Sequence, residues 1–243
     1  MKQLTLLLTS SPCLEGHADV NPAHGFAERL LRVVPRPAHG LYIASSPDDI
    51  AMTEYAAISM KETLAEAGVN FLSYNLLHSG TALQAETLVQ EADFIILGGG
   101  HVPTQNTFFL RIGLREMLAQ WEGTVMGISA GSMNCAANVY AMPELEGETL
   151  NPFYHRFMPG LGLTDIQIIP HFQILRHGVL DGKRILEDIG LRDSISHRFY
   201  ALPDGSYILK QGTREELFGP AWVLADGKLS VANHEGESLL LNE

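Results

Sequence analysis

Two short runs of apolar residues, each with a glycine at or next to its end, most constrain the fold of this chain. Residues 94–97 read FIIL and residues 124–128 read TVMGI, and neither run alternates apolar with polar side chains along its length. A strand without such alternation is typical of a parallel sheet whose two faces are both covered by helices. The two runs therefore predict a doubly wound parallel sheet, with loops that begin at the following glycines.

Further runs along the chain fit the same α/β pattern. Three of them are β-like and begin near residues 4, 40 and 70, where the sequence reads LTLLLTS, GLYIASS and NFLSYNL. Residues 51–67 repeat apolar side chains at mixed spacings of three and four and stop at Gly68, which predicts an amphipathic helix. Residues 13–40, which include several prolines, predict an irregular segment at the surface.

The C-terminal part of the chain has a different sequence pattern. Its β-rich runs FYALPDGSYILKQG and AWVLADGKLSVAN contain Asp-Gly pairs at 204–205 and 226–227. Asp-Gly favours tight turns between antiparallel strands, so we expect an antiparallel C-terminus. The predicted fold class is α/β, a three-layer α/β/α sandwich with a mostly parallel, doubly wound, flavodoxin-like sheet and a β-rich C-terminal end.

Length and composition favour one domain. The chain has 243 residues, of which 46% are hydrophobic, and this is enough apolar material for a sizeable core. It contains no internal repeat, low-complexity tract or long linker. We therefore expect residues 1–243 to form a single domain.

Charge and cysteine usage exclude several classes of partner. Asp and Glu outnumber Lys and Arg by 28 to 16, and no stretch gathers basic residues into a stripe that could follow phosphates. The apolar run Leu4–Leu8 is too short for a signal-peptide core or a membrane span. Cys13 and Cys135 match no metal-ligand spacing, which favours reduced thiols. We expect a cytoplasmic protein with no disulfide and no nucleic-acid or membrane partner.

The segment with the clearest chemical signature is residues 127–131, which read Gly-Ile-Ser-Ala-Gly. This G-x-S-x-G pattern follows a predicted strand and precedes the helix-capable stretch SMNCAANVYAM, the context of a nucleophile elbow. Ser129 is the candidate nucleophile, and the backbone N–H of Ala130 is placed to stabilise an oxyanion. The alternative is a tight turn in which Ser129 caps the helix, and Ser132 is a weaker candidate nucleophile.

A glycine run forms a second candidate feature. Gly98–Gly100 follow the strand FIIL and precede His101, at the sheet edge where open parallel sheets bind ligands. Gly99 and Gly100 are therefore candidate N–H donors for the second half of an oxyanion hole. A phosphate cradle is the other interpretation, although the chain lacks the G-x-x-x-x-G-K-[ST] pattern.

A hydroxyl nucleophile needs a general base, and that base needs an acceptor that fixes its tautomer. His171 follows the apolar run 166–170 and is the favoured base, while Asp204 follows another β-like run and is the candidate acceptor. The alternatives are a hydrogen-bonded histidine without a catalytic role and an ordinary Asp-Gly turn. No H-E-x-x-H motif occurs, and His171 and His177 have no nearby acidic partner at ligand spacing, so we expect no metal and no cofactor.

With these residues together, the chain resembles the peptidase E family of serine dipeptidases, which is related to cyanophycinases and has a class I glutamine amidotransferase-like fold. The matching segments are the first strand, Leu41 to Leu72, LGGG at 97–100, NTF at 106–108, GISAG at 127–131, PHF at 170–172 and LPDG at 202–205. The resemblance implies that Ser129 is the nucleophile, that His171 is the base and that Asp204 orients His171.

The chain departs from the family pattern in three places. The orienting acid is Asp204, one methylene shorter than the family glutamate, and His101 to Gln105 look inserted beside the active site, where they would reshape the substrate pocket. The family is thought to bind an N-terminal aspartate through an arginine downstream of the histidine, and neither Arg176 nor Arg184 aligns with that position. A preference for N-terminal aspartate is therefore left open.

The sequence predicts a serine hydrolase, a dipeptidase or small-peptide peptidase that works through an acyl-enzyme, with a homodimer as one possible assembly. One alternative is an α/β-hydrolase esterase, in which the order of acid and histidine would select Ser129, Asp204 and His234. The other is a non-catalytic module of the same fold that binds a small ligand at the strand ends.

Overall fold

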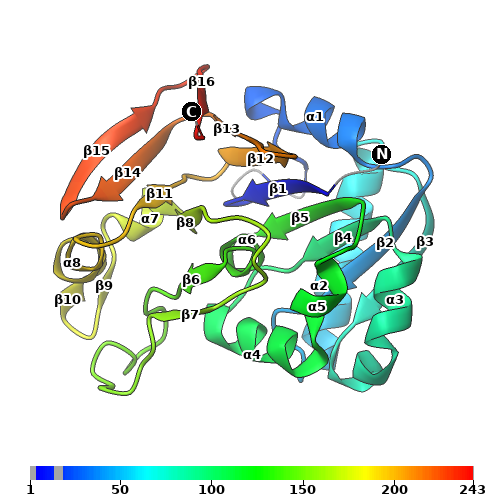
Figure 1. The fold of residues 1–243 in the computed structure, drawn as a ribbon, viewed down its shortest axis with the longest axis horizontal. Coiled ribbons are helices and arrows are strands. Elements are labelled where there is room, and N and C mark those ends of the chain that lie inside the picture. The colour runs from blue at the N-terminus through cyan, green and yellow to red at the C-terminus, as the bar shows by residue number, and fades with distance from the viewer. Residues whose placement is uncertain (1–3, 14–18, 243) are drawn as a thin grey trace.

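An eight-stranded sheet lies at the centre of the computed structural model, which describes residues 4–13 and 19–242 (Figure 1). Its strand order is β16-β13-β12-β1-β5-β4-β2-β3. The strands are β1 (Thr5–Thr9), β2 (Ala38–Ile43), β3 (Phe71–Leu77), β4 (Phe94–Leu97), β5 (Thr124–Ile128), β12 (Tyr207–Gln211), β13 (Arg214–Phe218) and β16 (Ser238–Leu240). The first five pair in parallel, and the last three extend the sheet antiparallel from the edge of β1.

Helices cover both faces of this sheet, as the apolar runs predicted. One face packs against α1 (Phe26–Val33) and α2 (Ile50–Glu66), and the other packs against α3 (Ala85–Glu91), α4 (Val102–Ile112), α5 (Leu114–Leu118) and α6 (Ala130–Asn134). Successive residues of β1 point to opposite cores: Leu7 joins the side of α1 and α2, while Leu6 and Leu8 join the other. All three leucines are buried, so the three-layer α/β/α class is confirmed.

A smaller four-stranded sheet, in the order β15-β14-β11-β8, lies beside the main one. It consists of β8 (Gln167–Ile169), β11 (Phe199–Ala201), β14 (Ala221–Ala225) and β15 (Lys228–Asn233). β8 and β11 are parallel, and the other pairs are antiparallel. Around this sheet lie β6 (Asn138–Tyr140), β7 (Phe157–Pro159), α7 (Phe172–Leu175), β9 (Val179–Leu180), β10 (Lys183–Arg184), a π-helical segment (Ile185–Gly190) and α8 (Leu191–Asp193). Two 3-10 segments, Ala23–Gly25 and Ser79–Gln84, precede α1 and α3.

The two Asp-Gly pairs have different roles. Asp226 and Gly227 form a two-residue turn between the antiparallel strands β14 and β15, with φ angles of 53° and 71°, as expected for such a hairpin. Asp204 and Gly205 instead lie between β11 of the small sheet and β12 of the main sheet. The expectation of a hairpin there is wrong, because local turn chemistry does not specify which strands the turn connects.

Residues 13–40 are not an irregular excursion throughout. Residues 26–33 form α1, because Phe26 and Leu30 lie one helical turn apart and both are buried against the main sheet. Residues 14–18, which belong to the same prediction, lie outside the described part of the chain.

The helix expected after the G-x-S-x-G motif is also shorter than predicted. α6 ends at Asn134, and residues 138–140 form β6, paired with β7. The backbone carbonyls of residues 134–137 accept hydrogen bonds from the N–H groups of residues 160–163. These long-range bonds replace the next turn of helix, and Val139 and Tyr140 are residue types that favour strands.

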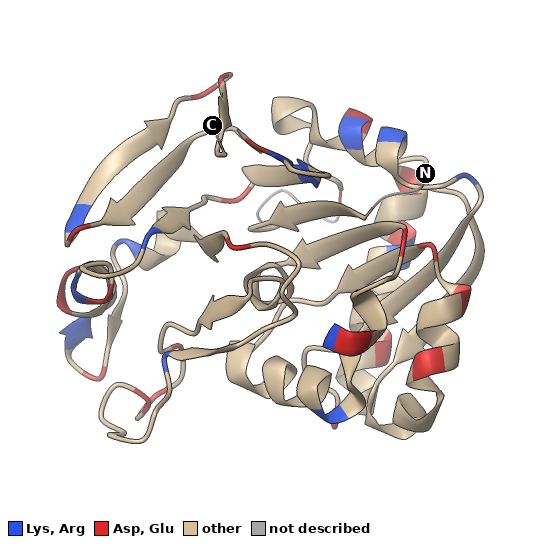
Figure 2. Cartoon of the chain, viewed as in Figure 1, with Lys and Arg blue, Asp and Glu red and all other residues tan. Residues whose placement is uncertain are grey.

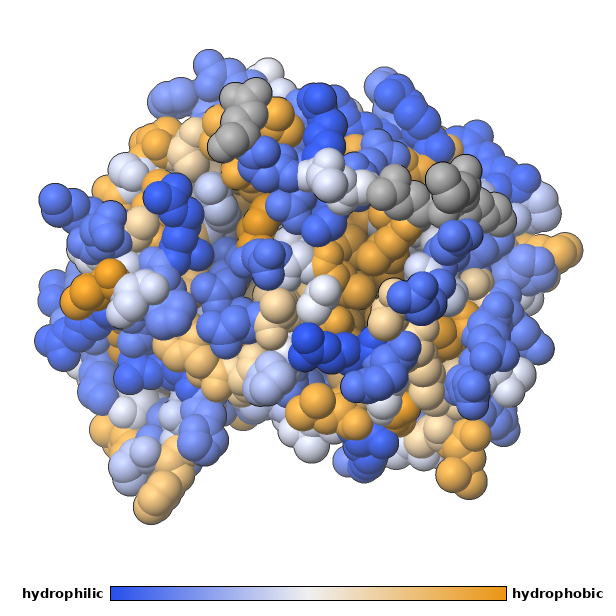
Figure 3. Space-filling view, viewed as in Figure 1, coloured by the Kyte–Doolittle hydropathy of each residue, from blue (hydrophilic) through white to orange (hydrophobic). Residues whose placement is uncertain are grey.

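The surface matches the acidic, mixed composition of the chain. Figure 2 shows Lys and Arg residues spread over several elements rather than gathered on one. In the same view hydrophilic residues cover most of the rim, and hydrophobic residues show near the middle of the face (Figure 3). Among the described residues, no helix combines the length and the apolar character needed to cross a bilayer.

Candidate active site

Ser129 occupies the sharp turn between β5 and α6, as the motif predicted. Its backbone has φ 49° and ψ −109°, a conformation that a residue with a side chain rarely adopts. The Ser129 N–H donates to the carbonyl of Thr9 at 3.0 Å, and its own carbonyl accepts from the N–H of Met133 at 3.0 Å. Such strain persists only where neighbouring contacts enforce it, and it is concentrated at functional positions.

The two outer glycines of the motif are required by close backbone approach. A Cβ on Gly127 would lie 2.6 Å from the backbone N of Ser132, and a Cβ on Gly131 would lie 2.3 Å from the carbonyl oxygen of Leu97. Any larger residue would push α6 away from β4 and β5. The G-x-S-x-G spacing therefore lets the helix lie directly against the strands that carry Ser129.

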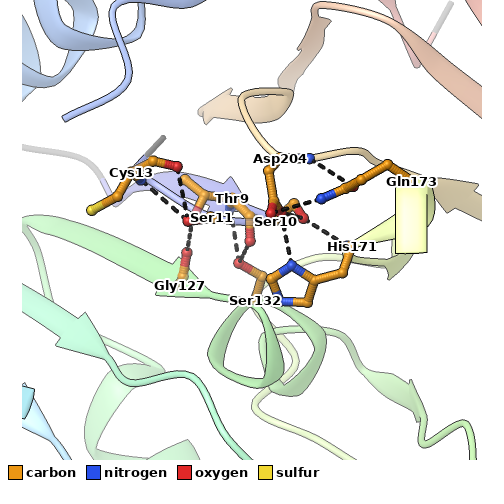
Figure 4. Close-up of polar contacts among 9 residues, drawn as sticks. All are labelled: Thr9, Ser10, Ser11, Cys13, Gly127, Ser132, His171, Gln173 and Asp204. Atoms are coloured by element: carbon orange, nitrogen blue, oxygen red, sulfur yellow. Dashed lines mark hydrogen bonds and ion pairs between the residues drawn. The ribbon is translucent and has the colours of Figure 1, made fainter. Parts of the chain in front are cut away.

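Ser132 has a structural role rather than the reactive one considered for it. Its hydroxyl accepts a hydrogen bond from the Thr9 N–H and donates one to the Thr9 carbonyl, both at 2.9 Å (Figure 4). The side chain is buried. Ser132 thus fastens α6 to the end of β1, and its hydroxyl is already committed to the backbone.

His171 and Asp204 meet at the end of the small sheet. His171 follows β8 and Asp204 follows β11, and because these two strands are parallel neighbours, their carboxyl ends lie together. His171 Nδ1 lies 2.7 Å from Asp204 Oδ1 (Figure 4). The aspartate, although shorter than glutamate, therefore reaches the ring. His171 Nε2 makes no hydrogen bond to any residue that the structure describes, which leaves it open to accept a proton.

Two residues that the sequence analysis missed also bind Asp204. Ser10 Oγ donates to Asp204 Oδ1 at 2.6 Å, and Gln173 Nε2 donates to Oδ2 at 2.8 Å. Partial burial raises the pKa of Asp204, but the hydrogen bonds from His171 and Ser10 and the charge of His171, together with Gln173, lower that pKa below its ordinary value. The only sequence signal for Ser10 was its place at the carboxyl end of a predicted strand.

Of the three candidate oxyanion donors, Gly99 and Gly100 lie on the glycine loop after β4, and Ala130 is the first residue of α6. A Cβ on Gly99 would lie 3.6 Å from the Cβ of Ser129, so the glycine loop passes beside the candidate nucleophile. Within the described part of the chain, the N–H groups of Gly99, Gly100 and Ala130 donate to no protein acceptor. The predicted donors are therefore unpaired, and Gly99 and Ala130 lie next to Ser129.

Two side chains donate hydrogen bonds to the carbonyl groups of the glycine loop. Ser45 Oγ donates to the Gly99 carbonyl at 2.5 Å, and Gln105 Nε2 donates to the Gly98 carbonyl at 2.7 Å. Gln105 is fully buried and also accepts from Asn134 Nδ2 at 3.0 Å. These bonds connect the glycine loop to Ser45, after β2, and to Gln105 of α4, and Gln105 in turn connects α4 to α6.

Residues 101–105, which looked inserted, begin α4 instead of forming a separate loop. His101 Nε2 lies 2.8 Å from Glu148 Oε1, and Glu148 Oε2 accepts the backbone N–H of Glu144 at 2.8 Å. His101 therefore connects the glycine loop to residues 144–148. No sequence pattern indicated this contact, because its partners are 47 residues apart along the chain.

Glu144 is a further carboxyl group close enough to interact electrostatically with His171. Loss of hydration and the neighbouring Glu148 carboxylate raise the pKa of Glu144 to about 7, and His171 acts in the opposite direction. Glu144 therefore adds a carboxyl group with a raised pKa to the edge of the site.

The two arginines considered for binding an N-terminal aspartate have partners outside the candidate triad. Arg184 pairs with Asp188 at 3.0 Å, and the guanidinium of Arg176 lies 5.9 Å from the ring centres of both Phe172 and Trp222. Across residues 4–13 and 19–242, neither arginine bonds to His171 or Asp204.

His234, the base of the esterase alternative, is exposed between β15 and β16, and its backbone N–H donates to Glu237 at 3.3 Å. In the described structure no hydrogen bond or ion pair joins it to Asp204, whose partners are His171, Ser10 and Gln173.

A polar cavity of about 490 Å³ lies beside this region, between residues 143–156 and 183–193. It shares Glu148 with the contact to His101 but is not lined by Ser129 or His171. The described residues contain no group of three or more His, Cys, Asp or Glu side chains arranged to hold a metal ion.

Comparisons with known proteins identify the family and the fold of the chain. Residues 27–218 match Peptidase family S51. A solved structure of a peptidase from an acI-B1 Actinobacterium is similar at 20% identity and a TM-score of 0.65, covering 99% of this chain and 98% of the other. A candidate peptidase E protein from Listeria monocytogenes EGD-e is similar at 16% identity and a TM-score of 0.57, covering 96% and 100%. At these identities the two structures show a shared fold, and no curated protein matches the sequence.

Replacement of Gln105 tests the support of the glycine loop. Gln105→Ala leaves the Gly98 carbonyl and the Asn134 amide without their buried partner, so we expect the free energy of unfolding to fall by about 1–3 kcal/mol. Urea denaturation measures this. Gln90→Ala is the matched control, because Gln90 is exposed on α3, and its cost should stay within about 0.5 kcal/mol. Equal effects of the two changes would contradict the proposed support.

The lowered pKa of Asp204 predicts a pH-dependent contribution to stability. Its folded-state pKa lies below the unfolded value of about 4, so the stabilisation is present above that value and is lost as the pH falls through the folded-state value. We expect Asp204→Asn to be less stable than wild type at pH 7, with the difference shrinking toward pH 2. Thermal unfolding at both pH values measures it, with Asp165→Asn, at an exposed carboxyl, as the control. A difference that stays constant with pH would refute the assignment.

Proposed function

Because the chain belongs to peptidase family S51 and is a serine-type peptidase, we propose that it hydrolyses dipeptides or other small peptides with Ser129 as nucleophile, His171 as general base and Asp204 as the group that orients His171. One observation carries the proposal: His171 Nδ1 is bonded to Asp204 at 2.7 Å, at the edge where the strained turn holds Ser129. Nucleophile, base and orienting acid are the three parts that acyl transfer needs.

In the proposed reaction His171 Nε2 removes the proton from Ser129 Oγ as this oxygen attacks the amide carbonyl of the substrate. The carbonyl oxygen becomes negatively charged and accepts hydrogen bonds from the N–H groups of Ala130 and of Gly99 or Gly100. Protonated His171 then donates its proton to the leaving amine, and an acyl group remains on Ser129. Attack by water, again with His171 as base, releases the acid and restores the hydroxyl.

Asp204 keeps the proton of His171 on Nδ1, which leaves Nε2 as the acceptor. Its lowered pKa means that the carboxylate is ionised throughout the neutral range, so it also stabilises the imidazolium that forms during the reaction. No cofactor enters this scheme.

We also propose that the protein works in the cytoplasm. Cys13 and Cys135 are both free thiols, which is typical of proteins from reducing compartments. Small peptides are the proposed partners, and a homodimer is one possible assembly.

Serine-directed labelling tests the nucleophile. We expect a fluorophosphonate to label the wild-type protein and the Ser129→Ala variant to remain unlabelled, because only Ser129 Oγ is activated. Hydrolysis of a dipeptide library that includes Asp-X members, followed in both proteins, gives the first-residue preference. A folded wild-type protein that is neither labelled nor active on any peptide would instead support a module that binds a small ligand.

The identity of the base is tested by two histidine variants. His171→Ala should reduce turnover by about 10³-fold or more, as expected for loss of a triad member. His234→Ala serves as the matched control and should retain wild-type turnover. His234 is exposed, and no hydrogen bond among the described residues joins it to His171 or Asp204. The reverse result would establish the esterase order of residues and overturn the proposal.

A further inference from the structure

The two residues at the end of β1 contact every member of the proposed triad. The Thr9 carbonyl accepts the backbone N–H of Ser129 at 3.0 Å. Ser10 Oγ accepts the backbone N–H of His171 at 2.7 Å and donates to Asp204 Oδ1 at 2.6 Å. Figure 4 shows Ser10 between the backbone of His171 and the carboxylate of Asp204. One strand end therefore connects three residues from three separate parts of the chain.

The hydrogen-bonding capacity of Ser10 fits this position. A serine hydroxyl has one proton to donate and lone pairs that accept. Here the proton goes to Asp204, so a lone pair accepts the N–H of His171. Ser10 is 0% exposed, so water cannot substitute for either partner. Its two bonds thus specify one orientation of the hydroxyl.

His171 needs such a constraint, because its backbone is strained. Its φ angle is 53°, in the left-handed region, at the residue before α7. The bond from its N–H to Ser10 holds this conformation, and so sets the direction in which the imidazole leaves the backbone. A small rotation there would change the position of Nε2 relative to Ser129, and a displacement of about 1 Å is enough to slow a reaction strongly.

Asp204 is held by the same hydroxyl. Its Oδ1 accepts from both Ser10 and His171 Nδ1, and its Oδ2 accepts from Gln173. The short aspartate side chain therefore has three donors that fix its carboxylate plane. Ser10 is the member of this set that binds both the acid and the base.

We propose that Ser10 is a positioning residue for the serine-peptidase reaction, in which one buried hydroxyl fixes the backbone of the base and the carboxylate of the orienting acid together. This inference rests on the function proposed above. It assigns Ser10 a role in the rate of the chemical step and none in contact with substrate.

The neighbouring serine provides a matched control. Among the described residues, Ser11 Oγ bonds only to the backbone of Cys13, two residues away, at 3.1 Å and 3.2 Å. Ser11→Ala removes the same atom one position along the chain without touching His171 or Asp204. Ser10→Thr keeps the hydroxyl and is the conservative variant.

The test compares Ser10→Ala, Ser10→Thr and Ser11→Ala with wild type by the rate of fluorophosphonate labelling and by kcat and KM on the best dipeptide. We expect Ser10→Ala to lose about 10- to 100-fold in labelling rate and in kcat, with KM within about twofold of wild type. Ser10→Thr should recover part of this loss, and Ser11→Ala should match wild type. Circular dichroism shows whether each variant is folded. If Ser10→Ala is not folded, Ser10→Cys replaces it, because a thiol is only a weak hydrogen-bond donor.

A second readout does not depend on activity. The proton shared by His171 Nδ1 and Asp204 should give a far-downfield proton NMR resonance that disappears in Asp204→Asn. We expect this resonance to shift or broaden in Ser10→Ala and to be unchanged in Ser11→Ala. A folded Ser10→Ala protein with wild-type kcat, labelling rate and resonance would overturn the inference. An inactive wild type would refute the proposed function, and the resonance would then decide alone whether Ser10 positions the pair.

Discussion

The parallel pairing of β1 with β5 is the interaction on which the candidate site depends. Its register sets Thr9 opposite Ile128, so β1 ends beside the residue that precedes Ser129. On its other side β1 pairs with the antiparallel strand β12, with Tyr207 opposite Thr9. The turn that contains Asp204 comes just before β12, so this pairing brings Asp204 to the end of β1. Because β1 lies between these two strands, a shift of its register by one residue would separate the candidate nucleophile from the acid.

The site lies where the two sheets meet. The main sheet supplies the strained turn and the glycine loop, and the small sheet supplies His171 at the end of β8. Asp204 lies on the segment that passes from one sheet to the other. The small sheet also has a core of its own, in which cluster residues such as Ile169, Phe172 and Phe199 pack around the strand ends next to His171.

Much of this arrangement was predictable because it depends on short patterns of neighbouring residues in the sequence. FIIL and TVMGI predicted the buried parallel strands, since a strand covered on both faces does not alternate apolar with polar residues, and the G-x-S-x-G motif predicted the elbow at Ser129. The α1 helix was missed because prolines on both sides obscured the spacing of Phe26 and Leu30. The role of Asp204 in a sheet crossover was missed because Asp-Gly has the same turn chemistry in a hairpin. Ser10 and Gln173 lacked any motif, because a single hydrogen bond across the fold leaves no periodic pattern.

The contacts of Ser10 affect the stage of folding at which the candidate active site is complete. They join residues 161 and 194 positions apart along the chain, and pairings this distant form late because the intervening chain must first be ordered. During synthesis the elbow with Ser129 leaves the ribosome well before the turn that carries Asp204. A nascent or truncated chain that ends before this turn would have a serine in place but no oriented base, so the completed fold itself would determine when hydrolysis begins.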